Sequence, residues 1–180
     1  MKTQYKIVFS GPVGAGKTTA IAAISDRPPV STEQKATDET RKLKKTTTVA
    51  MDYGSIRLPD GQLINLYGTP GQKRFDFMWS LLSDGAIGLV VVIDHSAENP
   101  LADLVNYIEA FREAFTQHNI VVGINKFRHG KGPTLERYHQ TLVERDIQSP
   151  VLEIDAREKS DVATLLQALL FNIDPNLQSV

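Results

Sequence analysis

A phosphate-binding loop is the clearest chemical feature of the sequence. Residues 11–18 read GPVGAGKT and match the pattern G-x-x-x-x-G-K-[ST] in full. An apolar run, YKIVF, precedes them and a helical run, TTAIAAIS, follows them, which is the strand and helix context that such a loop requires. Glycines let backbone N–H groups turn toward phosphate oxygens, and a helix N-terminus favours negative charge. The loop therefore predicts a bound nucleotide.

Two side chains of this loop have specific predicted roles. The ammonium of Lys17 reaches the outer phosphates, and the hydroxyl of Thr18 is offered to Mg²⁺. The predicted nucleotide contacts of the loop are Gly11, Val13, Gly14, Ala15, Gly16, Lys17, Thr18 and Thr19. A glycine-rich turn with a chance lysine is the alternative, and the flanking strand and helix pattern argues against it.

The elements that must position the loop alternate along the chain. The runs YKIVF, AIGLVVVID, IVVGIN and PVLEID are rich in Val and Ile and nearly continuous, as buried parallel strands are when helices cover both faces of a sheet. Helical stripes lie at residues 101–115, 135–142 and 162–170, and Asn99 and Pro100 supply the cap and first turn of the first stripe. This alternation predicts a doubly wound α/β fold.

One section departs from the alternation. TVAMDYGSIRL, PDG and QLINLYG read as two strands joined by a tight turn at Asp60-Gly61. Residues 26–47 are polar and predict a long loop, whose basic cluster from Arg41 to Lys45 is either solvated or a surface for an acidic partner. We therefore expect a P-loop NTPase (small G-protein) fold: a six-stranded, mostly parallel sheet with one antiparallel edge strand and helices on both faces.

The composition narrows the function classes. The chain has 180 residues, enough for one domain, and its net charge of -1 gives no electrostatic reason to expect nucleic acid or an anionic membrane. It has no cysteine, which excludes disulfides and prenyl or palmitoyl anchors. The longest apolar run, residues 86–93, is too short to span a bilayer. We expect a soluble, cytoplasmic protein without a membrane anchor.

Motifs downstream of the loop occur in a recognisable order. TTTVAMDYG, GTPGQKRF, the pair NK at residues 125–126 and DAR at residues 155–157 follow it. With these motifs the sequence resembles the Ras-like small GTPases, and within them the bacterial MglA-like branch and related predicted GTPases. The resemblance covers nearly all of residues 1–180. It implies a single small-GTPase-like domain, Mg²⁺ and GTP or GDP as cofactors, and a roadblock-type protein as partner or activator.

The resemblance also implies roles in two switch segments. Thr48 aligns with the threonine that binds Mg²⁺ when a γ-phosphate is present, with Thr46 and Thr47 as neighbouring alternatives. Gly71 would donate its N–H to the γ-phosphate, and Gln72 would orient the attacking water. The implied catalytic group is Lys17, Gly71 and Gln72. Either Arg41 or Arg74 is a candidate arginine finger, with a solvated loop arginine as the alternative for each.

Two further segments would contact the base. Asn125 and Lys126 match the base-reading motif, and Asp155, Ala156 and Arg157 match the second base loop. Lys126 is expected to pack along the base and brace the phosphate loop, and the N–H of Ala156 is expected to reach the base carbonyl.

The sequence departs from the family pattern in three places. Gly68 stands where most Ras-like proteins have an aspartate that steadies Mg²⁺ through water, which implies weaker Mg²⁺ organisation and slow unaided turnover. Asp94, at a strand end, is either a loop cap or a metal carboxylate, and the cap is the favoured interpretation. Val13 restricts the approach of an arginine finger. Arg128 replaces the aspartate of N-K-x-D, and a guanidinium cannot accept hydrogen bonds.

The replacement at Arg128 leaves base selectivity open. An unpaired guanine donor in a closed pocket costs about 1–3 kcal/mol, and Asp155 is the nearest alternative acceptor. We therefore weigh a Mg²⁺-dependent GTPase switch against a binding module that holds a purine nucleotide without turnover. An ATP- or GTP-dependent kinase or ATPase is a more distant alternative. The apolar residues 75 and 77–79 of the second switch are divided between the core and a partner surface.

Overall fold

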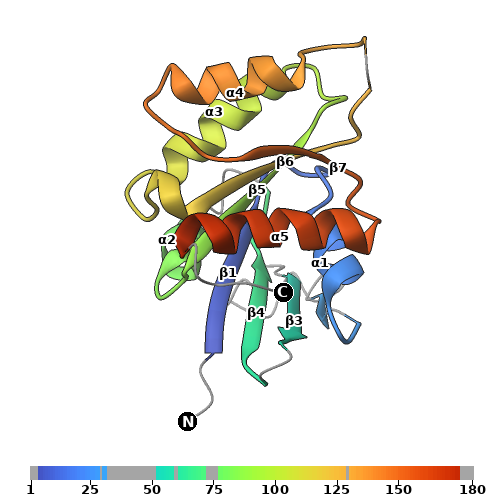
Figure 1. Ribbon diagram of the computed structural model, residues 1–180, viewed down its shortest axis with the longest axis vertical. Coiled ribbons are helices and arrows are strands. Elements are labelled where there is room, and N and C mark those ends of the chain that lie inside the picture. Colours follow the sequence, from blue (N-terminus) through green and yellow to red (C-terminus); the bar gives the residue numbers. More distant parts are fainter. Residues whose placement is uncertain are drawn as a thin grey trace, which may run out of the picture.

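A single mixed sheet organises the protein (Figure 1). The computed structural model describes residues 4–28, 30–31, 52–58, 61–71, 77–128 and 130–174. The strand order across the sheet is β2-β3-β4-β1-β5-β6-β7. The strands are β1 (Gln4–Ser10), β2 (Val30–Ser31), β3 (Asp52–Arg57), β4 (Leu63–Gly68), β5 (Gly88–Asp94), β6 (Ile120–Asn125) and β7 (Val151–Ile154).

The strand directions confirm the predicted mostly parallel α/β fold. β4, β1, β5, β6 and β7 are parallel to one another, whereas β3 is antiparallel to β4. The hairpin of β3 and β4 has the expected tight turn, with Gly61 at φ 82 and a backbone hydrogen bond of 2.9 Å from Leu58 N to Gln62 O.

A two-residue strand, β2, adds to the six predicted strands. Val30 pairs with Tyr53 and Ser31 with Asp52 in an antiparallel register. The sequence predicted only loop at these two residues, and they satisfy backbone groups along the otherwise open side of β3. The antiparallel strand β3 is therefore covered at this point and does not form the edge there.

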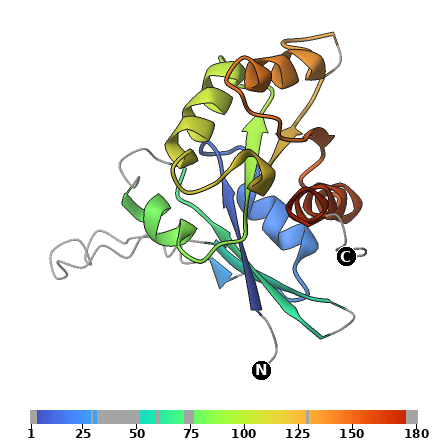
Figure 2. The ribbon, with the colours of Figure 1, turned by 60° about the vertical axis from the view of Figure 1, so that its left-hand side comes forward.

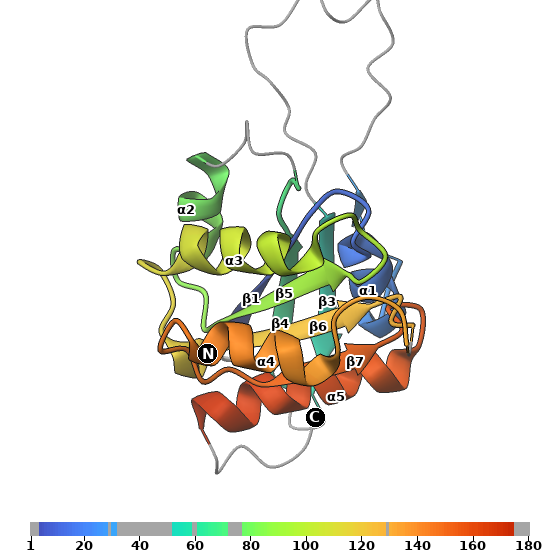
Figure 3. The ribbon, with the colours of Figure 1, turned by 90° about the horizontal axis from the view of Figure 1, so that it is seen from above.

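Helices cover both faces of the sheet, as Figures 2 and 3 show. α1 (Lys17–Ile24) and α5 (Lys159–Ile173) pack on one face with Ile7 and Phe9 of β1. α2 (Phe77–Ser83), α3 (Pro100–Phe111) and α4 (Leu135–Val143) pack on the other face with Val8. Successive residues of β1 therefore enter opposite cores, which explains why its buried stretch Ile7–Phe9 is apolar throughout. A short 3₁₀ helix, η3 (Gln117–Asn119), precedes β6.

Two helices begin at side-chain caps, of which Asn99 was expected from the sequence and Thr134 was not. The side chain of Asn99 accepts a hydrogen bond of 3.1 Å from Ala102 N at the start of α3, and Pro100 is the first residue of that helix. Thr134 accepts one of 3.2 Å from Arg137 N at the start of α4. Such caps satisfy backbone donors that the first helical turn leaves unpaired. The three helices predicted over residues 101–115, 135–142 and 162–170 are thus confirmed, although α3 ends at Phe111.

Candidate nucleotide-binding site

The parallel strands bring the predicted site together at one edge of the sheet. Residues 11–16 follow β1, Asp94 ends β5, Asn125 ends β6 and Asp155 follows β7. Carboxyl ends of neighbouring parallel strands lie side by side, so segments more than 100 residues apart in the sequence share one surface.

The phosphate loop has the backbone conformation that its glycines permit. Gly11, Gly14 and Gly16 have φ values of 138, 77 and 111, which residues with a side chain rarely adopt. A Cβ atom at Gly16 would also overlap the side-chain nitrogen of Asn125. The loop is therefore both curved and closely backed by the base-reading strand.

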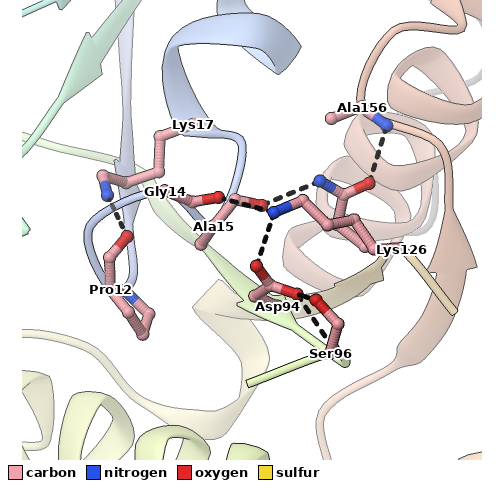
Figure 4. A network of polar contacts seen from close by, with 9 residues as sticks. Pro12, Gly14, Ala15, Lys17, Asp94, Ser96, Lys126 and Ala156 are labelled. Atoms are coloured by element: carbon pink, nitrogen blue, oxygen red, sulfur yellow. Dashed lines mark hydrogen bonds and ion pairs between the residues drawn. The ribbon is translucent and has the colours of Figure 1, made fainter.

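Lys17 lies inside the loop. The residue is only 7% exposed, and its ammonium donates to Gly11 O at 2.8 Å. It also donates to Pro12 O at 2.7 Å, as Figure 4 shows. Burial lowers the pKa of Lys17 to about 8, against the opposing effect of the Asp52 carboxylate. The loop thus holds a desolvated cation at the position that is expected to meet anionic phosphate oxygens.

Asp52 is a functional candidate that the sequence analysis missed. Its carboxylate accepts a hydrogen bond from the hydroxyl of Thr18, and Asp52 lies opposite Gly68 in the pairing of β3 with β4. A Cβ atom at Gly68 would come within 3.0 Å of the Asp52 Cβ and 3.1 Å of its Oδ2. Asp52 therefore brings a carboxylate from the neighbouring strand next to Thr18, beside the position where Gly68 has none.

The donors around Thr18 suit a magnesium ion. A carboxylate and a hydroxyl are hard oxygen ligands of the kind that Mg²⁺ prefers, usually together with phosphate oxygens and water. Thr18 and Asp52 would hold the ion at the opening of the phosphate loop, beside the cationic Lys17. Among the described residues there is no group of three or more His, Cys, Asp or Glu side chains that could hold a metal without such additional ligands.

The segment from Thr69 to Gly71 closes against the phosphate loop. The Thr69 hydroxyl donates to the Ser10 hydroxyl at 2.8 Å, and its N–H donates to Phe9 O at 2.8 Å. A Cβ at Gly71 would lie 2.6 Å from Val13 N and 3.0 Å from the Lys17 ammonium. Only glycine permits this approach without displacing the loop. The Val13 side chain itself points outward and is 66% exposed.

Asn125 ties the base loops to the phosphate loop. Its amide nitrogen donates to Ala15 O at 2.8 Å, and its amide oxygen accepts from the N–H of Ala156 at 3.1 Å. The side chain is 6% exposed. The Ala156 N–H, which we expected to reach the base carbonyl, therefore has an internal partner in this structure.

Lys126 braces the phosphate loop as predicted from the resemblance. Its ammonium donates to Gly14 O at 3.1 Å and to Asp94 Oδ2 at 2.5 Å (Figure 4). Asp94 also accepts from the N–H of Ser96 at 2.9 Å and from its hydroxyl at 2.6 Å. Burial acts to raise the pKa of Asp94, but the hydrogen bonds from Lys126 and Ser96 outweigh it and lower the pKa. These contacts match the favoured interpretation of Asp94 as a loop cap.

A pocket of about 640 Å³ opens beside these loops. Its walls include Gly14, Lys126, Phe127, Arg128 and Asp155, so it joins the phosphate loop to both base loops. Its volume suits a small-molecule ligand, and Arg128 lies in the wall where an acceptor for guanine was expected.

Asp155 is already engaged by its neighbour. The Arg157 guanidinium donates to it at 2.5 Å and 2.9 Å, and the Arg157 N–H donates to it at 2.9 Å. The side-chain and backbone hydrogen bonds from Arg157 lower the pKa of Asp155 to about 2. Asp155 remains an ionised acceptor at the pocket, but it is shared with Arg157.

Several predicted residues lie outside the described part of the chain. These are Thr48 with its alternatives Thr46 and Thr47, Gln72, and the candidate arginine fingers Arg41 and Arg74. The turn residue Asp60 lies outside it as well. The other predicted site residues all belong to the phosphate loop, the Gly71 segment or the two base loops.

Fold and loop together define a P-loop NTPase. Residues 27–173 match the family model described as "Conserved hypothetical ATP binding protein", and the chain belongs to that family. This match begins after residues 11–18, so the phosphate loop is an independent observation.

Two relatives extend the comparison. An uncharacterized protein of Methanocaldococcus jannaschii is 36% identical over 96 residues, which is 53% of this chain and 54% of that protein. The chain thus matches about half the length of this relative. The Ras-related protein RabC of Dictyostelium discoideum is 24% identical over 183 residues, which is 97% of this chain and 86% of that protein. The similarity to a Ras-related protein is in keeping with the P-loop NTPase fold.

The helices give one further finding. In the described part of the chain, none has both the length and the apolar character needed to cross a membrane.

Proposed function

We propose that this protein is a Mg²⁺-dependent GTP-binding switch that hydrolyses GTP slowly. The observation that carries the proposal is the joint placement of Lys17, Thr18 and Asp52 at a fully matched phosphate loop. On this proposal residues 1–180 act as one small-GTPase-like domain of the MglA-like kind.

Each residue at the loop has a distinct task. The Lys17 ammonium and the loop N–H groups bind the phosphates. Thr18 and Asp52 supply oxygen ligands on one side of the Mg²⁺ ion. When bound, Mg²⁺ would neutralise part of the phosphate charge. Thr48 joins that site when a γ-phosphate is present, and Gln72 orients the attacking water. Gly71 donates its N–H to the γ-phosphate, so both switch segments respond to its removal.

Unaided turnover is expected to be slow. Gly68 offers no carboxylate to steady Mg²⁺, and Asp52 reaches the metal site from the neighbouring strand. Val13, which is exposed above the loop, limits how an activator can approach. By the resemblance to MglA-like GTPases, we propose that a roadblock-type protein acts as the activating partner.

Phosphate release tests the catalytic part of this proposal. We expect slow Mg²⁺-dependent release from GTP, its acceleration by a roadblock-type partner, and its loss in Gln72→Ala. The control is Gln62→Ala, which changes a glutamine of the β3–β4 turn. Absence of partner stimulation, together with an unchanged rate in Gln72→Ala, would exclude a catalytic switch.

A second candidate function is a binding module with relaxed purine specificity and no meaningful turnover. Arg128 in the pocket wall favours it, because a guanidinium can only donate hydrogen bonds whereas the guanine N1 and N2 edge also donates. The family description names ATP. Mass spectrometry of the nucleotide that copurifies, followed by parallel titrations with GTP and ATP, separates the candidates. Exclusive binding of ATP would overturn the assignment to GTP.

A further inference from the structure

Two aromatic side chains hold consecutive carbonyl groups beside the phosphate loop. The indole N–H of Trp79 in α2 donates to Pro70 O at 3.2 Å. The hydroxyl of Tyr107 in α3 donates to Gly71 O at 2.7 Å. Neither residue belongs to the nucleotide motifs, and the site described so far does not require either of them.

The aromatic pair is itself held firmly. Trp79 is 7% exposed and Tyr107 is 4% exposed, and their ring centroids are 5.2 Å apart. Trp79 also stacks on Phe111 at 5.3 Å with an interplanar angle of 18°. Burial, with a smaller contribution from the charge of Asp103, raises the pKa of Tyr107 to about 12, so its hydroxyl remains a donor at neutral pH.

These hydrogen bonds fix the direction of an N–H group. A trans peptide is planar, and its C=O and N–H point in opposite directions; the described residues contain no cis peptide. Because Trp79 holds Pro70 O, the N–H of Gly71 in the same peptide points away from Trp79. A Cβ atom added at Gly71 would lie 2.6 Å from Val13 N and 3.0 Å from the Lys17 ammonium, so Gly71 lies between the aromatic pair and the phosphate loop.

We propose that Trp79 and Tyr107 are positioning residues that aim the Gly71 N–H at the terminal phosphate of a nucleoside triphosphate. The packing of α2 on α3 then sets the preference for triphosphate over diphosphate. This inference rests on the proposed function, because it assigns the terminal phosphate to Gly71.

Removal of one hydroxyl tests the proposal directly. Tyr107→Phe keeps the ring and loses the bond to Gly71 O. We expect its affinity for fluorescent GTPγS to fall about threefold to tenfold, the range for one neutral hydrogen bond, while its affinity for GDP changes less than about twofold. Tyr53→Phe is the matched control, because its hydroxyl bonds Asn65 at 2.8 Å, away from the loop. We expect this control to retain the wild-type ratio of GTPγS affinity to GDP affinity.

Trp79 provides a second readout because it is the only tryptophan in the sequence. Its emission in the wild-type protein should change when Mg²⁺ and GTPγS are added, change less with GDP, and respond weakly in Tyr107→Phe. An unchanged emission with GTPγS, or an equal loss of affinity for both nucleotides in Tyr107→Phe, would overturn the inference and leave the proposed function standing. Failure of the wild-type protein to bind either nucleotide would overturn both.

Discussion

The carboxylate of Asp52 can be moved to the strand where most Ras-like proteins carry one. Asp52 and Gly68 face each other across β3 and β4. The variant Asp52→Asn removes the charge, Gly68→Asp adds a second carboxylate, and the double variant Asp52→Gly with Gly68→Asp exchanges the two positions. We predict that the exchange restores Mg²⁺-dependent nucleotide binding that Asp52→Asn loses.

The contacts set the size of each effect. A hydrogen bond to a charged group contributes about 1.5–3 kcal/mol, so Asp52→Asn should weaken Mg²⁺ binding in the nucleotide complex about 10- to 150-fold. A Cβ at Gly68 would lie 3.0 Å from the Asp52 Cβ. Two carboxylates about 4 Å apart repel by about 4 kcal/mol at an effective dielectric constant of 20. Gly68→Asp alone should therefore destabilise the metal-free protein, and the exchange should relieve this repulsion.

The assay is the Mg²⁺ dependence of nucleotide dissociation. Fluorescent GDP is released from each variant over a series of free Mg²⁺ concentrations, and thermal unfolding is measured with and without Mg²⁺. The matched control is Asp26→Asn, which removes a carboxylate that accepts a 2.6 Å hydrogen bond from Arg57 N at the far end of β3. It should leave the Mg²⁺ dependence unchanged.

Two results would refute this reasoning. If Asp52→Asn kept the wild-type Mg²⁺ dependence, the bond from Thr18 to Asp52 would be structural only. The second result is an exchange variant that is as stable as wild type but does not recover the Mg²⁺ dependence. It would show that a carboxylate close to Thr18 is not sufficient for Mg²⁺ binding.

Three more predictions address the rest of the site. Lys17→Met should abolish nucleotide binding in a titration. Its thermal midpoint should equal or exceed that of the wild type, because the change removes a buried cation and keeps a side chain of similar length. An unfolded variant would contradict this prediction. Arg128→Asp should raise the ratio of GTP to ATP affinity about 5- to 150-fold in competition titrations, since each guanine donor that regains an acceptor is worth about 1–3 kcal/mol, and an unchanged ratio would place Arg128 outside base recognition. The Asp155 carboxyl should titrate by NMR with a pKa of about 2, and in Arg157→Gln this pKa should rise toward its ordinary value of 3.8. Because the pKa is lower in the folded state, the pair stabilises the fold fully at a pH above 3.8. This stabilisation is lost as the pH falls through 2.

Most of the fold could be predicted because its signals are local. The runs that became β5 and β6, and the second half of β1, are buried on both faces, which is why these runs are nearly continuously apolar. The caps Asn99 and Thr134 act within one helical turn of their partners. In contrast, β2 has two residues and α2 has seven, and elements this short carry too little periodicity to be recognised.

The site was predictable in its motifs but not in its cross-strand contacts. Gly68 showed that a carboxylate was missing, yet finding Asp52, the replacement that we propose, required the register that places it opposite Gly68. That register depends on the length of the hairpin turn, and a slip of one residue would turn Asp52 to the other face. The strand pattern with the turn at Gly61 contained this information in principle. The aromatic contacts of Trp79 and Tyr107 depend on how two helices pack, which no local pattern specifies.

The residues from Asn125 to Arg128 differ in whether they bond the phosphate loop. Asn125 and Lys126 each bond the phosphate loop, at Ala15 O and Gly14 O, so a change at either position would loosen the loop as well as the base contact. Arg128 lies two residues further on, with its side chain exposed in the pocket wall. A substitution there alters the groups offered to a base while the bracing bonds stay in place. The bracing bonds therefore do not depend on Arg128, and we expect a substitution there to change the choice of nucleotide more than the stability of the fold.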